Sequence, residues 1–487
     1  SLQSKVLSPS ELQADFRYLR RLLEETHPGL YRYVPKAAMQ AKLDSLAGQL
    51  SKPLPFYDFY RLVAGLMADI RCAHTHALPA KEWEKAFAND WKTLPFFMFP
   101  VQNRSYVLFN GTTDQTIKPG YELLSINGRS MASIREVMYR YHWADGYIET
   151  SKQAALQGQL FALFYYWFID RPDTYHLTFK SLSGDTLELD AAAQPFLPAY
   201  KRMTKNPVNK QMMTWYNAKK PKHPWRLYFP KDMAQTAYLR FDSFGGEGAT
   251  NSEQAVARFR SFMDASMAKI EKKGTKNLVI DVRHNPGGWD SQGIELFTYL
   301  AKSDTAVKYY ARQHSITDST EFLQFSDLSE KDRKNVKQEL ARETDGTFTL
   351  KGDGKPFSPK ANRFKGQVYI VMNGRSASTT SEFLAVAHAN RIGTFIGEES
   401  GGAYEGGNGG SFVHLSLPHS NIQVTTPLLY YNNAVGKPRE KGRGTMPDYT
   451  VPITLDNLLN HNDDVSAFVK ELIKKQGLNA KPQRTQR

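Results

Sequence analysis

The sequence predicts an α/β fold, because short buried strands lead through turns rich in glycine and serine into helical segments. Val368–Met372 is an apolar, mostly β-branched run, which is typical of a strand covered on both faces. Asn373-Gly374 follows as a turn signal, and apolar residues at helical spacing come after it. Asn277–Val282 is a second buried-strand pattern, and it runs into the stretch Arg283–Gly288, which ends in two glycines.

Several hydroxyl side chains crowd the predicted entry to the helix after the first strand: Ser376, Ser378, Thr379, Thr380 and Ser381. A hydroxyl at a strand-to-helix turn is rigidly held, and it lies close to helix N-terminal amides that favour developing negative charge. The same hydroxyls could instead only cap the helix. Glycines at the end of the other strand let backbone amides approach a ligand closely. Together the two strand ends fit a nucleophile that faces an oxyanion hole.

Composition limits the other classes of function. The chain has 487 residues, with 63 Lys and Arg against 49 Asp and Glu, for a net charge of +14. A chain of this length predicts roughly two or three domains. The basic residues are spread along the sequence and no nucleic-acid-binding motif accompanies them, so we expect a solvated basic surface and no nucleic-acid partner. Cys72 is the single cysteine, which leaves no intramolecular disulfide and no cysteine-based metal site.

The start of the sequence bears on location. The chain begins SLQSKVL, without methionine and without a signal peptide. No apolar run approaches the roughly 20 residues that cross a bilayer. We expect that an export signal has been removed and that the protein is periplasmic or associated with the cell envelope.

Five segments, in order along the chain, resemble the S41 family of serine peptidases, which includes the tail-specific and C-terminal processing peptidases and their tricorn-like relatives. They are AYLRFDSF (237–244), IDVRHNPGG (280–288), VMNGRSASTTSEFLA (371–385), RIGTFIGEESGG (391–402) and GTMPDYTV (444–451). The resemblance implies an α/β catalytic domain with a crotonase-like (ClpP-like) sheet, expected over residues 225–455. Within it, the highly charged stretch Asp318–Thr349 reads as a helical insertion.

Other parts of the chain also resemble this family. Apolar residues at helical spacing after Ser8-Pro9 predict a helical N-terminal segment over residues 1–80. Residues 117–128 resemble the part of a PDZ domain in which a glycine turn precedes ELLSING, so a PDZ-like domain is expected over 92–195. A linker over 196–224 and a C-terminal helix with a basic tail over 456–487 complete the predicted organisation.

The resemblance implies that Ser378 is the nucleophile. The backbone N–H of Thr379 would then contribute to the oxyanion hole, together with Gly287 or Gly288. One departure leaves an alternative open: the family serine stands three positions before a glutamate, whereas Ser378 stands four before Glu382. Alignment on that glutamate would make Thr379 the nucleophile.

The resemblance also implies which residue is the base that accepts the proton of the serine nucleophile. Tail-specific members pair the serine with a lysine, but Ala403 falls at that position here. The tricorn-like branch uses a histidine instead, and its members carry an Asp-Gly-His-Thr stretch after a helix. Ala73-His74-Thr75 resembles the end of that stretch, with Cys72-Ala73 in place of Asp-Gly, so the resemblance implies His74 as the base. A neutral imidazole can accept a serine proton near neutral pH. His74 and His76 could also share a metal ion, but no third ligand is evident in the sequence.

The acid that would orient His74 has three candidates. Glu440 precedes Pro447-Asp448 much as the tricorn-like acid does, and Glu398 and Glu399 are the alternatives. Any of the three could instead be an ordinary surface glutamate.

We therefore expect a hydrolase: a serine protease that cleaves peptide or protein substrates as an endopeptidase or tail-specific processing peptidase, through an acyl-enzyme on Ser378 with His74 as base. No metal or organic cofactor is expected, because no ligand cluster or phosphate-binding glycine motif accompanies the serine. The alternative is a non-catalytic peptide- or ligand-binding protein on the same scaffold, as in the retinoid-binding proteins that resemble this family. A third possibility is peptide docking through the PDZ-like region alone.

Overall fold

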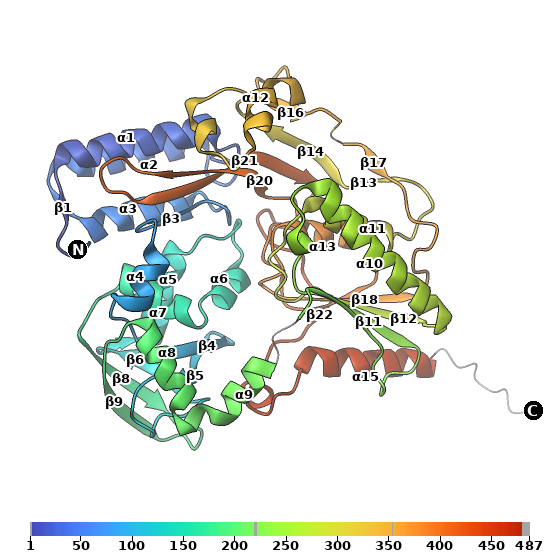
Figure 1. Cartoon of the computed structure of the whole chain (residues 1–487), viewed down its shortest axis with the longest axis horizontal. Helices are drawn as coiled ribbons and strands as arrows, with labels where there is room; N and C mark the ends of the chain where they lie inside the picture. Colours follow the sequence, from blue (N-terminus) through green and yellow to red (C-terminus); the bar gives the residue numbers. More distant parts are fainter. Residues whose placement is uncertain (1, 219–221, 353, 480–487) are drawn as a thin grey trace, which may run out of the picture. The chain divides into compact units, whose positions relative to one another are not determined.

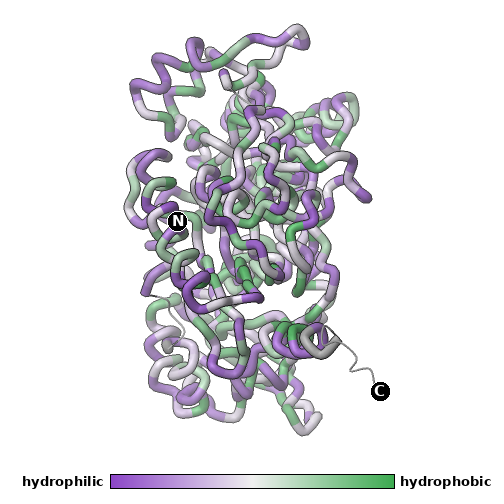
Figure 2. The backbone as a smooth tube through the Cα atoms, turned by 90° about the vertical axis from the view of Figure 1, so that its right-hand side faces the viewer, coloured by the Kyte–Doolittle hydropathy of each residue, from purple (hydrophilic) through white to green (hydrophobic). Residues whose placement is uncertain are grey.

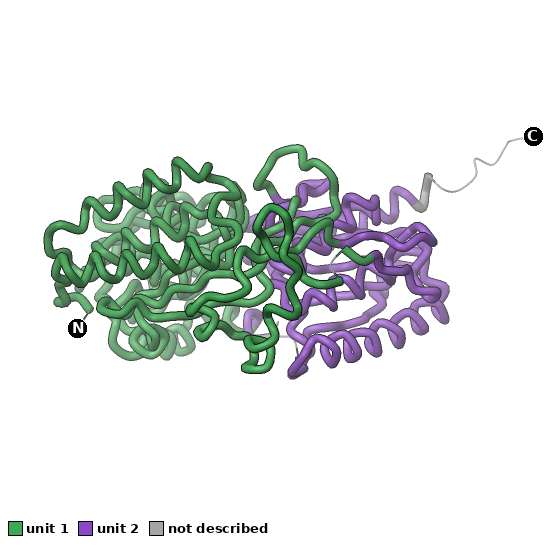
Figure 3. The backbone as a smooth tube through the Cα atoms, turned by 90° about the horizontal axis from the view of Figure 1, so that it is seen from above, with its two compact units in different colours: residues 1–214, 310–355, 405–443 green, residues 215–309, 356–404, 444–487 purple. Residues whose placement is uncertain are grey.

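The computed structural model describes residues 2–218, 222–352 and 354–479. The chain forms two compact units, drawn in green and purple in Figure 3. Unit 1 comprises Ser1–Thr214, Tyr310–Lys355 and Glu405–Arg443, and unit 2 comprises Trp215–Tyr309, Pro356–Tyr404 and Gly444–Arg487. Parts of the predicted linker (219–221) and of the predicted basic tail (480–487) lie outside the described residues. Both units combine helices with sheets, so the predicted α/β class is confirmed.

Unit 1 begins with three helices, α1 (Pro9–Thr26), α2 (Lys36–Gly48) and α3 (Phe56–Asp69). A capping box starts α1: the Ser8 hydroxyl accepts from the Glu11 N–H, and the Glu11 carboxylate accepts from the Ser8 N–H at 2.8 Å. The helix ends at His27, whose N–H donates to the Leu23 carbonyl. Hydrophilic and hydrophobic residues interchange along most of the backbone, as Figure 2 shows, which fits helices and strands with one buried face.

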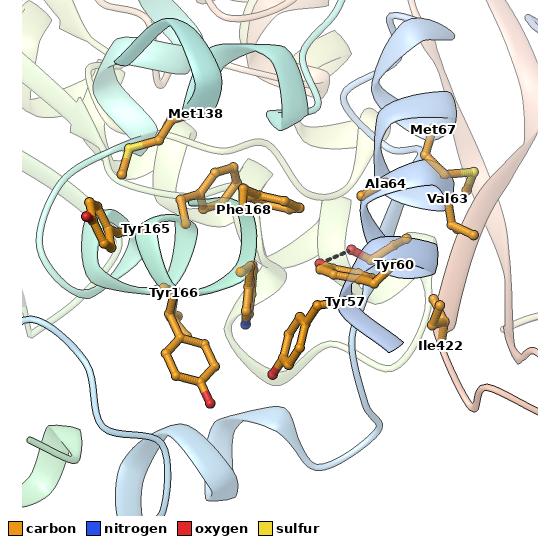
Figure 4. Packing of buried hydrophobic residues seen from close by; sticks show 14 of the residues in the cluster. Tyr57, Tyr60, Val63, Ala64, Met67, Met138, Tyr165, Tyr166, Phe168 and Ile422 are labelled. Carbon is orange, nitrogen blue, oxygen red and sulfur yellow. Dashed lines mark hydrogen bonds between the residues drawn. The ribbon is translucent and has the colours of Figure 1, made fainter. Parts of the chain in front are cut away.

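An aromatic core joins α3 to α7 (Gln159–Phe168), and Figure 4 shows these rings together. The rings of Tyr60 and Phe168 stack with centroids 5.5 Å apart, and Tyr57 meets Tyr166 edge-on at 6.0 Å. Such pairs add about 0.5–1.5 kcal/mol each beyond the area they bury. The Tyr60 hydroxyl also donates to the Ala77 carbonyl at 3.0 Å, which ties α3 to the strand that follows it.

Unit 1 contains two larger sheets. The first has the order β4-β5-β6-β8-β9, with β7 beside β6, and it lies within the region predicted to be PDZ-like. The second has the order β15-β16-β14-β21-β20, with β3 beside β21. The bounds are β3 (His76–Leu78), β4 (Phe96–Val101), β5 (Arg104–Asn110), β6 (Glu122–Ile126), β7 (Arg129–Ser130), β8 (Thr174–Lys180), β9 (Thr186–Ala192), β14 (Tyr310–Ser315), β15 (Leu340–Arg342), β16 (Phe348–Leu350), β20 (Asn408–Ser416) and β21 (Gln423–Asn433).

Shorter elements complete unit 1 (Figure 1). They are β1 (Val6–Leu7), β2 (Leu54–Pro55), α4 (Trp83–Asn89), α5 (Met131–Tyr141), α6 (Glu149–Ala155), α8 (Phe196–Lys205) and α12 (Glu330–Glu339), and α9 (Lys210–Ala218) follows α8 along the chain. The stretch predicted to be a helical insertion thus contains a 3-10 helix (Glu321–Phe325), the α-helix α12, and two strands, β15 and β16, which pair with each other. No helix among the described residues is long and apolar enough to cross a membrane.

Unit 2 is built on a sheet of order β10-β11-β12-β18-β19-β22, in which all neighbours are parallel except β10 and β11. The strands are β10 (Trp225–Tyr228), β11 (Thr236–Phe241), β12 (Asn277–Asp281), β18 (Gln367–Met372), β19 (Thr394–Gly397) and β22 (Tyr449–Thr450). The helices are α10 (Ser252–Lys272), α11 (Asp290–Thr298), α13 (Thr379–Ala389), α14 (Leu455–Leu459) and α15 (Asp464–Asn479), and β13 (Val307–Lys308) pairs with β17 (Pro356–Phe357).

Both faces of this sheet are covered, as the apolar runs predict. Val279 and Val371 pack with Val465 and other residues of α15 on one face. Phe241 packs against Phe259 of α10 on the other, with ring centroids 5.5 Å apart. Because neighbouring parallel strands end at the same edge, the chain segments after β12 and β18 lie side by side there.

Candidate active site

Ser378 lies at the corner between the turn after β18 and the first residue of α13. Its backbone has φ 54° and ψ −133°, a conformation that costs a residue other than glycine about 1–3 kcal/mol. Its side chain makes no capping hydrogen bond to α13, and the residue is partly exposed. The reading in which this hydroxyl only caps the helix is therefore wrong. The hydroxyl is free to meet a ligand at a helix N-terminus.

Hydrogen bonds to the neighbouring loop hold the turn in front of Ser378. The Ser376 hydroxyl donates to the Val282 carbonyl at 2.8 Å and accepts from the Asn373 N–H at 3.1 Å. The Ala377 N–H donates to the Asn285 carbonyl at 3.1 Å. The loop after β12 thus fixes the position of the serine turn after β18.

The two glycines of the β12 loop approach Ser378 closely. Gly287 has φ +101° and Gly288 has φ +145°, so both use conformations open to glycine. A Cβ added at Gly287 would lie only 2.7 Å from the Ser378 Cβ. The Gly287 N–H donates to the Asn285 side chain at 2.9 Å. By contrast, the amide hydrogens of Gly288 and Thr379 have no acceptor among the described residues.

The Thr379 side chain has a different environment from that of Ser378. Its hydroxyl lies 3.0 Å from the Gly288 carbonyl and 2.8 Å from a carboxylate oxygen of Asp290, and the residue is 1% exposed. The hydroxyl proton is therefore given to an acceptor inside the protein, and the side chain helps to hold the glycine loop.

A partly buried ion network anchors the same loop at its start. Arg283 binds Asp281 through Nη2 at 2.7 Å and Asp463 through Nη1 at 2.8 Å, and Arg240 also binds Asp281, at 2.6 Å. Burial by itself would raise the pKa of Asp281, but the charges of Arg283 and Arg240 outweigh it and lower that pKa. Burial, together with these cations, lowers the pKa of the neighbouring His284 to about 4. Charged and hydrogen-bonded side chains therefore hold the start of the loop in place.

His74 lies in unit 1, in the turn between α3 and β3. Its ring packs against Phe412 of β20, with centroids 5.2 Å apart, and it borders Gly409. Its Nδ1 is buried and has no hydrogen-bond partner among the described residues. Ser378 belongs to unit 2, so the pairing of His74 with Ser378 stays a prediction.

The three candidate acids lie in different surroundings. Glu440, in unit 1, is 73% exposed at its side chain and lies 3.7 Å from Arg443. In unit 2, Glu399 is buried and accepts from the Gly444 N–H at 2.8 Å, while burial raises the pKa of Glu398. Which of the three would orient His74 stays a prediction. In the part of the chain that the structure describes, no group of three His, Cys, Asp or Glu side chains is placed to hold a metal ion.

Sequence reasoning missed several residues that shape the turn at Ser378 and the turn at His74. Asn285 binds both the serine turn and Gly287, yet it is only one polar residue in a loop sequence. Around His74, the missed residues are His27 and Asp145. His27 precedes Pro28-Gly29 and resembles an ordinary helix end in the sequence. Its role follows only from its hydrogen-bond partner in the folded chain.

Comparison with known proteins gives one family match and several similar folds. Residues 235–451 match the family model of peptidase family S41. Mature CPAF complexed with lactacystin has a similar structure, with a TM-score of 0.61 and 13% identity over 96% of this chain and 98% of that one. Mature CPAF aligns with a TM-score of 0.59 and 14% identity over 97% and 98%. At such identities the likeness concerns the fold alone. None of the curated proteins compared with the chain matches it. The match with peptidase family S41 over residues 235–451, a little under half of the chain, indicates a serine peptidase.

Proposed function

We propose that this chain hydrolyses peptide bonds through an acyl-enzyme on Ser378, with His74 as the general base. The observation that carries the proposal is the corner at Ser378: a strained backbone presents a hydroxyl next to the glycine loop, and the amide hydrogens of Gly288 and Thr379 lack an acceptor among the described residues. Backbone donors of this kind stabilise an oxyanion where it develops. Of the predicted donors, Gly288 and Thr379 fit this role, while Gly287 supplies the close approach.

In the proposed reaction, Ser378 Oγ attacks the carbonyl carbon of the scissile peptide bond, and His74 accepts the hydroxyl proton. The carbonyl oxygen becomes the oxyanion and accepts from the amides of Gly288 and Thr379. The C–N bond then breaks, and the leaving amine takes the proton from His74. Water, deprotonated in its turn by His74, hydrolyses the ester on Ser378. This chemistry requires an imidazole nitrogen within about 2.6–3.2 Å of Ser378 Oγ in the working enzyme.

The decisive experiment is labelling of the intact chain with a fluorophosphonate, followed by mapping of the modified residue. The proposal is supported if the original chain is labelled on Ser378, the Ser378→Ala variant is not labelled, and the Thr379→Val variant is still labelled. A label on Thr379 would transfer the nucleophile to that residue. If no residue is labelled and no peptide is cleaved, while peptides still bind, the non-catalytic binding protein becomes the better account.

The remaining fine assignments are proposals as well. We propose that residues 92–195 form a PDZ-like domain that binds extended peptide ends by strand addition, as a tail-specific peptidase would use it. Its antiparallel sheet and the neighbouring α5 support this. Free-acid and amidated versions of one peptide should then differ in affinity for the full chain. A periplasmic or envelope location is proposed too, and fractionation of cells that express the natural protein tests it.

A further inference from the structure

The turn that carries His74 is tied to the end of α1. His27 Nε2 lies 2.7 Å from the Thr75 hydroxyl, and both residues are buried, at 1% and 0% exposure. The Gly29 N–H donates to the other ring nitrogen, Nδ1, at 3.1 Å. Because Nδ1 accepts, Nε2 must carry the proton and donate it to Thr75. Burial lowers the pKa of His27 to about 3, so the ring stays in this neutral form at ordinary pH.

The same end of α1 also reaches the strand on which the His74 ring rests. A Cβ added at Gly29 would lie 2.2 Å from the side-chain oxygen of Asn408, so the chain passes very close to that buried residue. Asn408 begins β20 and is followed by Gly409, which borders the His74 ring. The three residues from His27 to Gly29 therefore contact both the turn that carries His74 and the strand against which it packs.

Other bonds hold the first half of the turn, and the bond from His27 helps to hold the second half. The Ala73 N–H donates to the Asp145 carboxylate at 2.8 Å, and the Gly146 N–H donates to the Arg71 carbonyl at 3.0 Å. On the other side of His74, Thr75 donates its N–H to the Cys72 carbonyl at 3.1 Å, and its hydroxyl accepts from His27.

We propose that His27 is a positioning residue, which through its hydrogen bond to Thr75 fixes the orientation of the His74 imidazole. The inference rests on the proposed function, in which His74 is the base. His27 itself touches neither substrate nor reacting atoms. Loss of the bond lets the turn shift, and a shift of about 1 Å at a catalytic group can cost about 100-fold in rate.

The test compares kcat and KM of full-length variants on one peptide substrate. Thr75→Val keeps the side-chain shape but loses the hydroxyl, and it should lower kcat about 10- to 100-fold with KM nearly unchanged. Thr75→Ser keeps the hydroxyl and should restore most of kcat. The matched control is Thr425→Val, which removes another threonine–histidine bond of unit 1, the 3.0 Å contact with His414, and should leave kcat unchanged.

A second set of variants covers a failure of Thr75→Val to fold. His27→Gln can place an amide N–H near the position of Nε2, whereas His27→Asn cannot, so the glutamine variant should retain more kcat. In a His74→Ala background, Thr75→Val should not lower the residual rate further, because the group it positions is gone.

The outcomes separate the two proposals. If His74→Ala keeps full turnover, the proposed base is wrong, whatever the Thr75 variants do. If His74→Ala loses turnover but folded Thr75→Val and His27→Asn keep full kcat, the base stands and the positioning role is refuted. The positioning role would also be refuted if Thr75→Val lowered the rate by the same factor in the original chain and in the His74→Ala variant, because the effect would then be a general structural one.

Discussion

Gly287→Ala tests how closely the glycine loop is held against the Ser378 turn. An added Cβ would lie 2.7 Å from the Ser378 Cβ, 2.9 Å from the Ala377 carbonyl oxygen and 3.0 Å from the Thr379 nitrogen. None of these atoms can rotate away, since they belong to the backbone or are fixed to it. The substitution must therefore move either the loop or the corner that carries Ser378.

The expected loss of stability follows from two terms. Holding alanine at φ +101° costs about 1–3 kcal/mol, and overpacking costs about 1–3 kcal/mol more. Gly287→Ala should therefore lower the free energy of unfolding by about 2–6 kcal/mol. The matched control is Gly274→Ala in the same unit, at φ +59°, where no heavy atom lies within 4 Å of the added Cβ. Only the backbone cost of about 1–2 kcal/mol applies there.

Two measurements on the full chain check this reasoning: urea unfolding, and the rate constant for fluorophosphonate labelling of Ser378. We expect Gly287→Ala to slow labelling about 10-fold or more, because the hydroxyl and the oxyanion donors move relative to each other. Gly274→Ala should label at the original rate. The reasoning is refuted if Gly287→Ala labels normally and destabilises no more than the control.

Three further predictions concern the base, the ion network and cofactors. His74→Ala should lower turnover about 10²- to 10⁴-fold without changing the unfolding midpoint, and unchanged turnover would place the base elsewhere. Although burial acts to raise the pKa of Asp463, Arg283 outweighs it and holds that pKa well below its ordinary value, so the ion pair stabilises the fold above about pH 4 and is lost as the pH falls further. The deficit in unfolding free energy of Asp463→Asn, relative to the unchanged protein, should thus shrink as the pH falls from 6 to 2, and parallel stability curves would contradict this. Dialysis against EDTA should leave peptidase activity intact, and a loss that zinc restores would show that the chemistry needs a metal.

The sequence by itself determined the local parts of this protein. The apolar runs before Asn373 and Arg283 specify strands covered on both faces, one followed by a turn rich in serine and the other by a loop that ends in two glycines. That much follows from side-chain pattern and turn chemistry, which act over a few residues. The same local signals marked Ser378 as a nucleophile candidate but could not separate it from Thr379.

The tertiary structure decided what depends on partners distant in the sequence. It directs the Thr379 hydroxyl to Gly288 and Asp290, commits the Gly287 N–H to Asn285, and leaves the Ser378 hydroxyl without a capping bond. It also brings β3 beside β21, more than 300 positions along the chain. His27, at the end of one helix, meets Thr75 only because the chain packs α1 against the turn after α3. A hydrogen bond is short and directional, so its partner is set by three-dimensional placement, which no local pattern in the sequence encodes.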